Sequence, residues 1–83
     1  MKGFLYFSAE WCQPCKMLGP IMEQVTKQGI PVNKVNVDYE VTLTKQYNVT
    51  SVPTVILVEN GVEKTRFVGA KPMNEIIRIY NEQ

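Results

Sequence analysis

The chain contains no histidine, and its only two cysteines, Cys12 and Cys15, stand three residues apart. A zinc site needs four nitrogen, sulfur or oxygen ligands, so this pair could hold a metal only by sharing ligands between chains. We therefore expect no bound metal. A purely structural disulfide is also poorly supported, because the loop that it would close is too short to constrain the unfolded chain much.

Other absences argue against further classes of protein. The nine lysines and arginines are scattered and the net charge is +1, so no basic block can neutralise the phosphates of a nucleic acid. No stretch approaches the roughly 20 apolar residues that span a bilayer. The apolar run near the N-terminus is too short for a signal peptide. We expect a monomer in the cytoplasm that binds neither nucleic acid nor membrane.

What the chain does contain is an ordinary globular composition, with 45% apolar and 20% charged residues. Its length predicts a single domain, 1–83, that buries roughly 60–65% of the surface of the unfolded chain. Strands are predicted from apolar and alternating runs at 3–9, 32–38, 54–59 and 62–68. Asn60-Gly61 predicts a hairpin between the last two strands.

Apolar residues at helical spacing predict helices over 13–28 and 39–47, and a third helix that begins at Pro72. We expect Pro20 to kink the first helix and Gly29 to end it. The order β-α-β-α-β-β-α predicts an α/β fold. Its first two strands should be parallel and its last two antiparallel, in one mixed four-stranded sheet with helices on both faces.

The segment "EWCQPCK" places the cysteine pair where the first strand gives way to the first helix. Free backbone N–H groups and the helix dipole at such a position favour a thiolate. Cys12 is predicted to be the exposed nucleophile. Cys15, one turn into the helix and partly buried, is predicted to be the resolving thiol. The pattern favours a redox-active Cys12–Cys15 disulfide over a metal site.

Several segments together resemble the thioredoxin family, and the resemblance covers nearly the whole chain. "AEWCQPCKMLGP" is similar to the active-site segment of the family, and "NVTSVPT" to its loop with a cis-proline. "VENG" and "FVGA" match further on. The usual first strand and helix of the family are missing. The resemblance implies a thioredoxin-like fold and a thiol-disulfide oxidoreductase with no bound cofactor.

The resemblance also assigns roles to residues outside the cysteine pair. It implies a cis bond before Pro53 and a Val52 backbone that pairs with an extended substrate peptide. Trp11, a core aromatic on the alternative interpretation, is expected to form an apolar lip for a docking partner. Gly69 and Ala70 are expected to belong to the same contact surface, or only to a turn.

Four positions bear on the redox chemistry. Tyr6 stands where the family usually has a buried aspartate that assists proton transfer at the second thiol, and a phenol is a poor base at neutral pH. Lys34 matches the lysine that neighbours this aspartate, and it would favour a thiolate if it lay near the thiols. Gln13 replaces the usual glycine between the cysteines, whereas Pro14 is retained and is typical of reducing members.

We interpret the chain as a protein disulfide reductase. The resemblance suggests a flavoprotein thioredoxin reductase and ribonucleotide reductase as partners. One alternative is a glutathione-linked glutaredoxin, which the short length favours. Another is a binding or assembly module that uses the same fold without its thiols.

Overall fold

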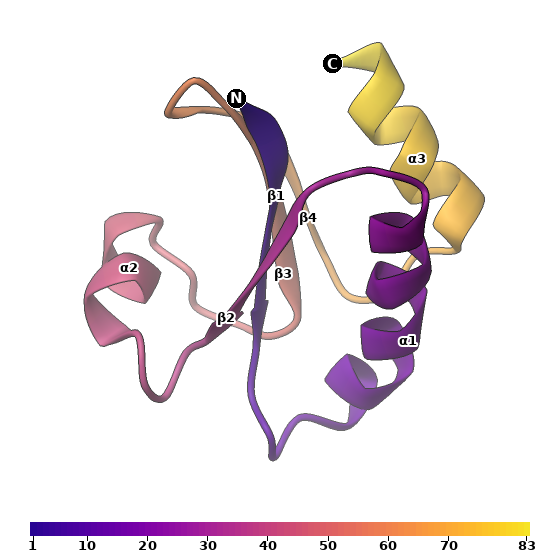
Figure 1. The fold of residues 1–83 in the computed structure, drawn as a ribbon. Coiled ribbons are helices and arrows are strands. Elements are labelled where there is room, and N and C mark those ends of the chain that lie inside the picture. Colours follow the sequence, from indigo (N-terminus) through magenta and orange to yellow (C-terminus); the bar gives the residue numbers. More distant parts are fainter.

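The chain folds, in a computed structural model that describes all 83 residues, in the predicted order β-α-β-α-β-β-α (Figure 1). The strands are β1 (Lys2–Ser8), β2 (Val32–Asn36), β3 (Thr54–Glu59) and β4 (Val62–Val68), and the helices are α1 (Gln13–Lys27), α2 (Val41–Gln46) and α3 (Met73–Glu82). The helix predicted over 39–47 is shorter than expected, because residues 37–39 form a turn.

The four strands form one mixed sheet in the order β2-β1-β3-β4. As predicted, β1 and β2 are parallel, and β3 and β4 form an antiparallel hairpin. Asn60 and Gly61 at its tip both have positive φ angles, of 52° and 81°, as a tight hairpin turn requires. The two central strands, β1 and β3, hold most of the buried strand residues.

Helices cover both faces of the sheet, which confirms the predicted layers (Figure 1). Helices α1 and α3 pack on one face over the larger core, and α2 lies on the other face over a smaller one. The larger cluster consists of Phe4, Tyr6, Leu18, Met22, Val25, Ile30, Val55, Leu57 and Ile76. The smaller consists of Phe7, Val35 and Ile56, with Leu43 and Tyr47 of the α2 segment packed against it.

Helix α1 carries the segment of interest at its N-terminus and is anchored along its length. Leu18, Met22 and Val25 are buried at helical spacing against the sheet. The helix continues through Pro20 and ends before Gly29, whose φ of +86° is the left-handed conformation that glycine adopts freely. The kink at Pro20 stays a prediction. The anchored helix fixes where its first turn meets the end of β1.

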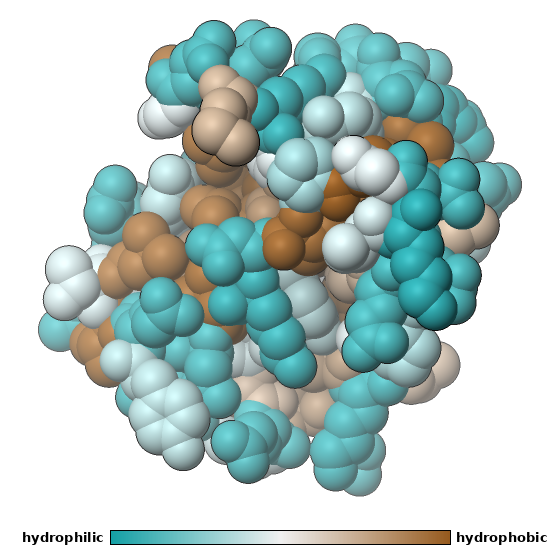
Figure 2. All heavy atoms as spheres, viewed as in Figure 1, coloured by the Kyte–Doolittle hydropathy of each residue, from teal (hydrophilic) through white to brown (hydrophobic).

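The surface mixes polar side chains with separate apolar areas (Figure 2). Most large apolar residues are covered, and a small set is exposed: Met1, Trp11, Met17, Tyr39, Val41, Val62 and Val68. No helix has the combination of length and apolar character that crossing a membrane requires.

Candidate active site

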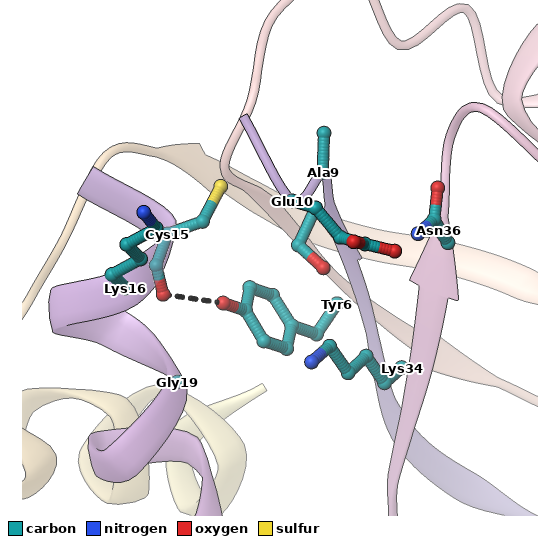
Figure 3. A pocket seen from close by; sticks show the side chains of 9 residues that line it. Tyr6, Ala9, Glu10, Cys15, Lys16, Gly19, Lys34 and Asn36 are labelled. Atoms are coloured by element: carbon teal, nitrogen blue, oxygen red, sulfur yellow. Dashed lines mark hydrogen bonds between the residues drawn. The ribbon is translucent and has the colours of Figure 1, made fainter. Parts of the chain in front are cut away.

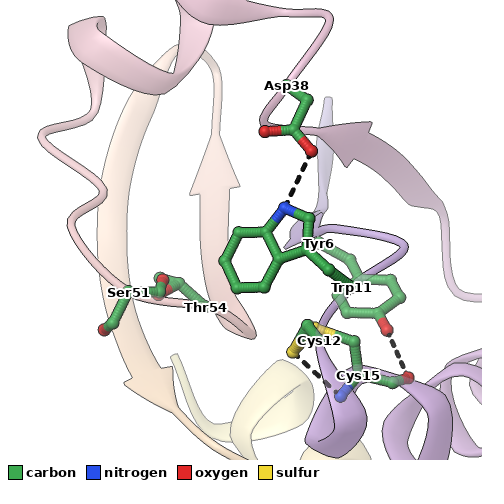
Figure 4. The surroundings of a disulfide bond; sticks show 7 residues. All are labelled: Tyr6, Trp11, Cys12, Cys15, Asp38, Ser51 and Thr54. Atoms are coloured by element: carbon green, nitrogen blue, oxygen red, sulfur yellow. Dashed lines mark hydrogen bonds between the residues drawn. A yellow bond between two sulfur atoms is a disulfide. The ribbon is translucent and has the colours of Figure 1, made fainter.

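Cys12 and Cys15 are joined in a disulfide at the start of α1, with their Cα atoms 5.3 Å apart (Figure 4). Cys12 is the N-cap residue, with an extended backbone, and its Sγ accepts a hydrogen bond from the Cys15 N–H at 3.2 Å. The sulfur therefore occupies the position where an N-cap acceptor normally satisfies a free amide of the first turn. The same amide would stabilise a negative charge on this sulfur after reduction.

Both cysteines are buried in this oxidised state, and the expectation of an exposed Cys12 is wrong. Cys12 is 4% exposed and Cys15 is 5% exposed. They form a small cluster with Ala9, against which Val37 and Val52 pack. Nothing in the local sequence around Cys12 reveals this cover, because Val37 and Val52 come from loops that are distant along the chain.

Trp11, directly before the disulfide, is 68% exposed and is not a core aromatic. Its indole Nε1 donates a hydrogen bond to Asp38 Oδ2 at 2.9 Å, which holds the ring on the surface next to the cysteines (Figure 4). Our interpretation of the sequence missed Asp38. A usable signal was present, because β1 and β2 are parallel and their carboxyl ends meet at one edge of the sheet.

The loop before β3 lies against the disulfide and leaves backbone groups free. The Val52–Pro53 peptide bond is cis, and the Val52 side chain packs on the cysteine cluster. Neither the N–H nor the C=O of Val52 forms a hydrogen bond within the chain. The Pro53 carbonyl accepts the Gly69 N–H at 2.9 Å, so the turn after β4 lies beside this loop. Ala70 follows and is exposed.

The residues between the cysteines, Gln13 and Pro14, lie in the first turn of α1 and are exposed. No side-chain hydrogen bond joins Gln13 to another residue of the chain. Pro14 has no N–H to donate, and in the first turn this causes no loss of helical hydrogen bonding. Both residues are thus available to a partner that approaches the disulfide.

Tyr6 is buried below the disulfide, 3% exposed, and its hydroxyl donates to the backbone carbonyl of Cys15 at 3.0 Å (Figure 3). Burial raises the pKa of Tyr6 above its ordinary value, and this effect exceeds the opposite effect of the Ser8 hydroxyl. The phenol therefore stays neutral at physiological pH. It ties β1 to the first turn of α1 and does not act as a base.

A cavity of about 370 Å³ opens between the first turn of α1 and the ends of β1 and β2. It is lined by Tyr6, Ser8, Ala9, Glu10, Cys15, Lys16, Gly19, Lys34 and Asn36. Lys34 and Cys15 thus line the same cavity, and the influence of the lysine on the thiols stays a prediction. Lys34 takes part in no ion pair within the chain, so its positive charge faces the cavity and the solvent.

The sequence comparisons with known proteins all match thioredoxins. The sequence model of the thioredoxin family matches residues 2–82. A thioredoxin of Chlamydia caviae is 42% identical over 78 residues, which make up 92% of this chain and 76% of that protein. A thioredoxin of Mycoplasma genitalium is 40% identical over 77 residues, with 90% of this chain and 76% of that protein covered.

Solved structures agree with the sequence relatives. Thioredoxin-2 of a malaria parasite, described as a component of that parasite's protein secretion machinery, superposes with a TM-score of 0.93 at 30% identity. The superposition covers 100% of this chain and 84% of that one. A thioredoxin of Fasciola hepatica gives a TM-score of 0.88 at 29% identity and covers 96% of this chain and 78% of its own.

The Tyr6 hydrogen bond generates a prediction about stability. Tyr6→Phe should lower the free energy of unfolding of the oxidised protein by about 1 kcal/mol at neutral pH, because the Cys15 carbonyl loses a buried donor. Since the folded-state pKa of Tyr6 is raised, its contribution is complete below the unfolded-state value of about 10 and declines as pH rises beyond it.

Urea unfolding at neutral pH and at about pH 10.5 measures both effects. Tyr39→Phe is the matched control, because Tyr39 is 78% exposed and should change neither value. Equal stability of Tyr6→Phe and the unmodified protein at neutral pH would contradict the assignment. A difference in unfolding free energy between the two proteins that is as large at alkaline pH as at neutral pH would also contradict it.

Proposed function

The chain belongs to the thioredoxin family and is a dithiol oxidoreductase that reduces protein disulfides, and we propose that a flavoprotein thioredoxin reductase supplies its electrons in the reducing cytoplasm. The observation that carries the proposal is the placement of the Cys12–Cys15 disulfide at the N-terminus of α1, beside the exposed ring of Trp11. This arrangement suits a protein partner better than a small charged one.

The reaction proceeds by two exchanges of sulfur partners. The Cys12 thiolate attacks one sulfur of the substrate disulfide, forms a mixed disulfide and releases the other substrate sulfur as a thiolate. The Cys15 thiol then loses its proton and attacks Cys12 Sγ. The Cys12–Cys15 disulfide forms, and the second substrate sulfur leaves and is protonated. The substrate gains two electrons, and the reductase later returns two electrons to the protein.

The substrate segment that carries the disulfide docks in extended form beside the cysteine pair. The free N–H and C=O of Val52 can pair with its backbone, as in strand addition. Pro53 fixes the loop that presents Val52. Gly69, which has no side chain, and the small Ala70 let the partner chain approach. Trp11 covers the apolar part of the contact, and the exposed indole supplies area with little loss of side-chain freedom.

Gln13 and Pro14 complete this surface from the first turn of α1. Because their side chains are exposed next to Cys12, they contact whichever partner is bound and influence the reduction potential of the pair. Ribonucleotide reductase, which the family resemblance suggests as a partner, is a candidate substrate for this surface.

The main alternative is a glutaredoxin that is recycled by glutathione. Glutathione carries two carboxylates, so its site requires cationic or backbone donors around the thiol. The cations on this side of the chain are Lys16, Lys34 and Lys71. Lys71 already lies 3.9 Å from the Glu75 carboxylate and over the Phe67 ring. Lys16 and Lys34 line the cavity on the Cys15 side, whereas the hollow beside Trp11 and Val52 is lined by no lysine or arginine, which disfavours glutathione there.

The division of labour between the thiols gives a direct prediction. Cys15→Ser should accumulate a stable mixed disulfide between Cys12 and a protein substrate such as insulin, because the group that resolves it is absent. Cys12→Ser should accumulate none. Non-reducing gels and mass spectrometry of the trapped species identify the linked cysteine. Trapping through Cys15 in the Cys12→Ser variant would reverse the assignment.

The choice of reductant gives a second prediction. Oxidised protein should turn over rapidly with thioredoxin reductase, NADPH and insulin, and slowly with glutathione, glutathione reductase and NADPH. The potentials of the two families differ by about 40–70 mV, or roughly 2–3 kcal/mol for two electrons. The fall in NADPH absorbance over time measures the rate of both reactions.

The double variant Cys12→Ser/Cys15→Ser is the control and should consume no NADPH in either system. Fast turnover with glutathione alone would place the chain with the glutaredoxins. If the double variant supported the same cellular role as the unmodified protein, the role would be that of a binding module.

A further inference from the structure

The resolving step poses a problem of proton transfer that the residues already described do not solve. Cys15 must lose its thiol proton before it attacks Cys12, and a free cysteine thiol titrates at about 8.5, above physiological pH. Cys15 is 5% exposed, and the cavity that it lines is the space through which water can approach it. The group that accepts the proton must therefore line the space below Cys15 or be connected to it by water.

Several titratable groups lie in or near that space. Tyr6 is buried and neutral, and its hydroxyl already donates to the Cys15 carbonyl. Lys16 and Lys34 line the same cavity, but an ammonium group has no lone pair to accept a proton. Asp38 is outside the cavity lining and accepts the indole N–H of Trp11. These groups leave one candidate on the cavity wall.

That candidate is Glu10, the only carboxylate among the nine lining residues. It comes from the turn between β1 and α1, and in Figure 3 its carboxylate extends over the cavity toward Asn36. No residue of the chain pairs with this carboxylate in a hydrogen bond or ion pair. The cavity of about 370 Å³ has room for several water molecules, and its walls offer polar groups to bind them.

We propose that Glu10 accepts the Cys15 proton through water in this cavity during resolution of the mixed disulfide. The inference rests on the proposed function and assigns its proton-transfer step. The proton passes from Cys15 Sγ through water to a Glu10 oxygen, and the electron pair of the S–H bond remains on sulfur. The thiolate forms the bond to Cys12 Sγ, and the leaving substrate thiolate takes a proton from solvent.

A proton acceptor and a mere negative charge make opposite predictions for Glu10→Gln. A nearby carboxylate disfavours a thiolate by repulsion, so its removal alone would favour Cys15 ionisation and speed resolution. Loss of the acceptor would instead slow resolution. The sign of the rate change therefore separates the two roles without any comparison of magnitudes.

The experiment mixes reduced protein with excess insulin, quenches with acid, and measures the mixed disulfide by mass spectrometry over time. At neutral pH, Glu10→Gln should resolve it about 10-fold more slowly or worse, a smaller effect than the 10²–10⁴-fold of a base in direct contact. The difference should vanish near pH 9.5, about one unit above the ordinary thiol value, where the thiol ionises without help.

Glu23→Gln is the matched control. Glu23 is also exposed and lies on α1, and it lines a neighbouring hollow with Tyr6 and Lys34 that does not include Cys15. It should leave resolution unchanged. Glu10→Asp keeps an acceptor and should retain much of the rate. Tyr6→Asp places a carboxylate on the cavity wall, so it should speed resolution and make a second change, Glu10→Gln, nearly silent.

Unchanged or faster resolution in Glu10→Gln at neutral pH would overturn the proposal, and so would an equal loss at both pH values. Failure of disulfide reduction through Cys12 has a different signature, because no mixed disulfide through Cys12 would then form in any variant. Formation of the mixed disulfide at the normal rate, followed by slow resolution only in Glu10→Gln, is the supporting result.

Discussion

The hydrogen bond from the Cys15 N–H to Cys12 Sγ is the contact on which the site depends. It exists because Cys12 ends the loop after β1 and caps α1, so its sulfur takes the place of a capping oxygen. The arrangement requires β1 and α1 to be held rigidly together. The buried face of α1 and the Tyr6 bond to the Cys15 carbonyl provide this constraint. The rigid core of the domain thus serves to keep one sulfur at one helix terminus.

The two cysteines are buried, but the surface next to them is accessible to a protein partner. The cysteines are buried against Val37 and Val52, whereas Trp11 next to them is exposed and held by Asp38. A small ligand would find little exposed sulfur. An extended protein segment, in contrast, can use the free Val52 backbone and the indole surface before exchange begins. Cys15 is buried as well, and we propose that its proton leaves through water in the cavity that it lines.

The sequence predicted the fold well, because the signals that set it are local. The Asn60-Gly61 turn, the helical spacing in α1 and the apolar run of β1 each act within a short segment, and their order fixes the sheet. The burial of Cys12 and the acceptor of Trp11 were not predicted. Both arise where segments distant along the chain meet at one edge of the sheet. Val52 carries no local pattern that indicates its contact, whereas Asp38 could have been placed there from the parallel pairing of β1 and β2. The polar cavity was not predicted either, because it forms only when β2 packs beside β1 and the first turns of α1.

We propose that the N-terminus of α1 holds Cys12 as a thiolate in the reduced protein. The most direct measurement is the rate of alkylation of each cysteine by iodoacetamide in the reduced protein, as a function of pH, with the sites mapped by mass spectrometry. We expect Cys12 to react faster than Cys15 at neutral pH, with a half-maximal rate below the value of about 8.5 for free cysteine. A Cys12 midpoint at or above that value, or faster alkylation of Cys15, would contradict the account.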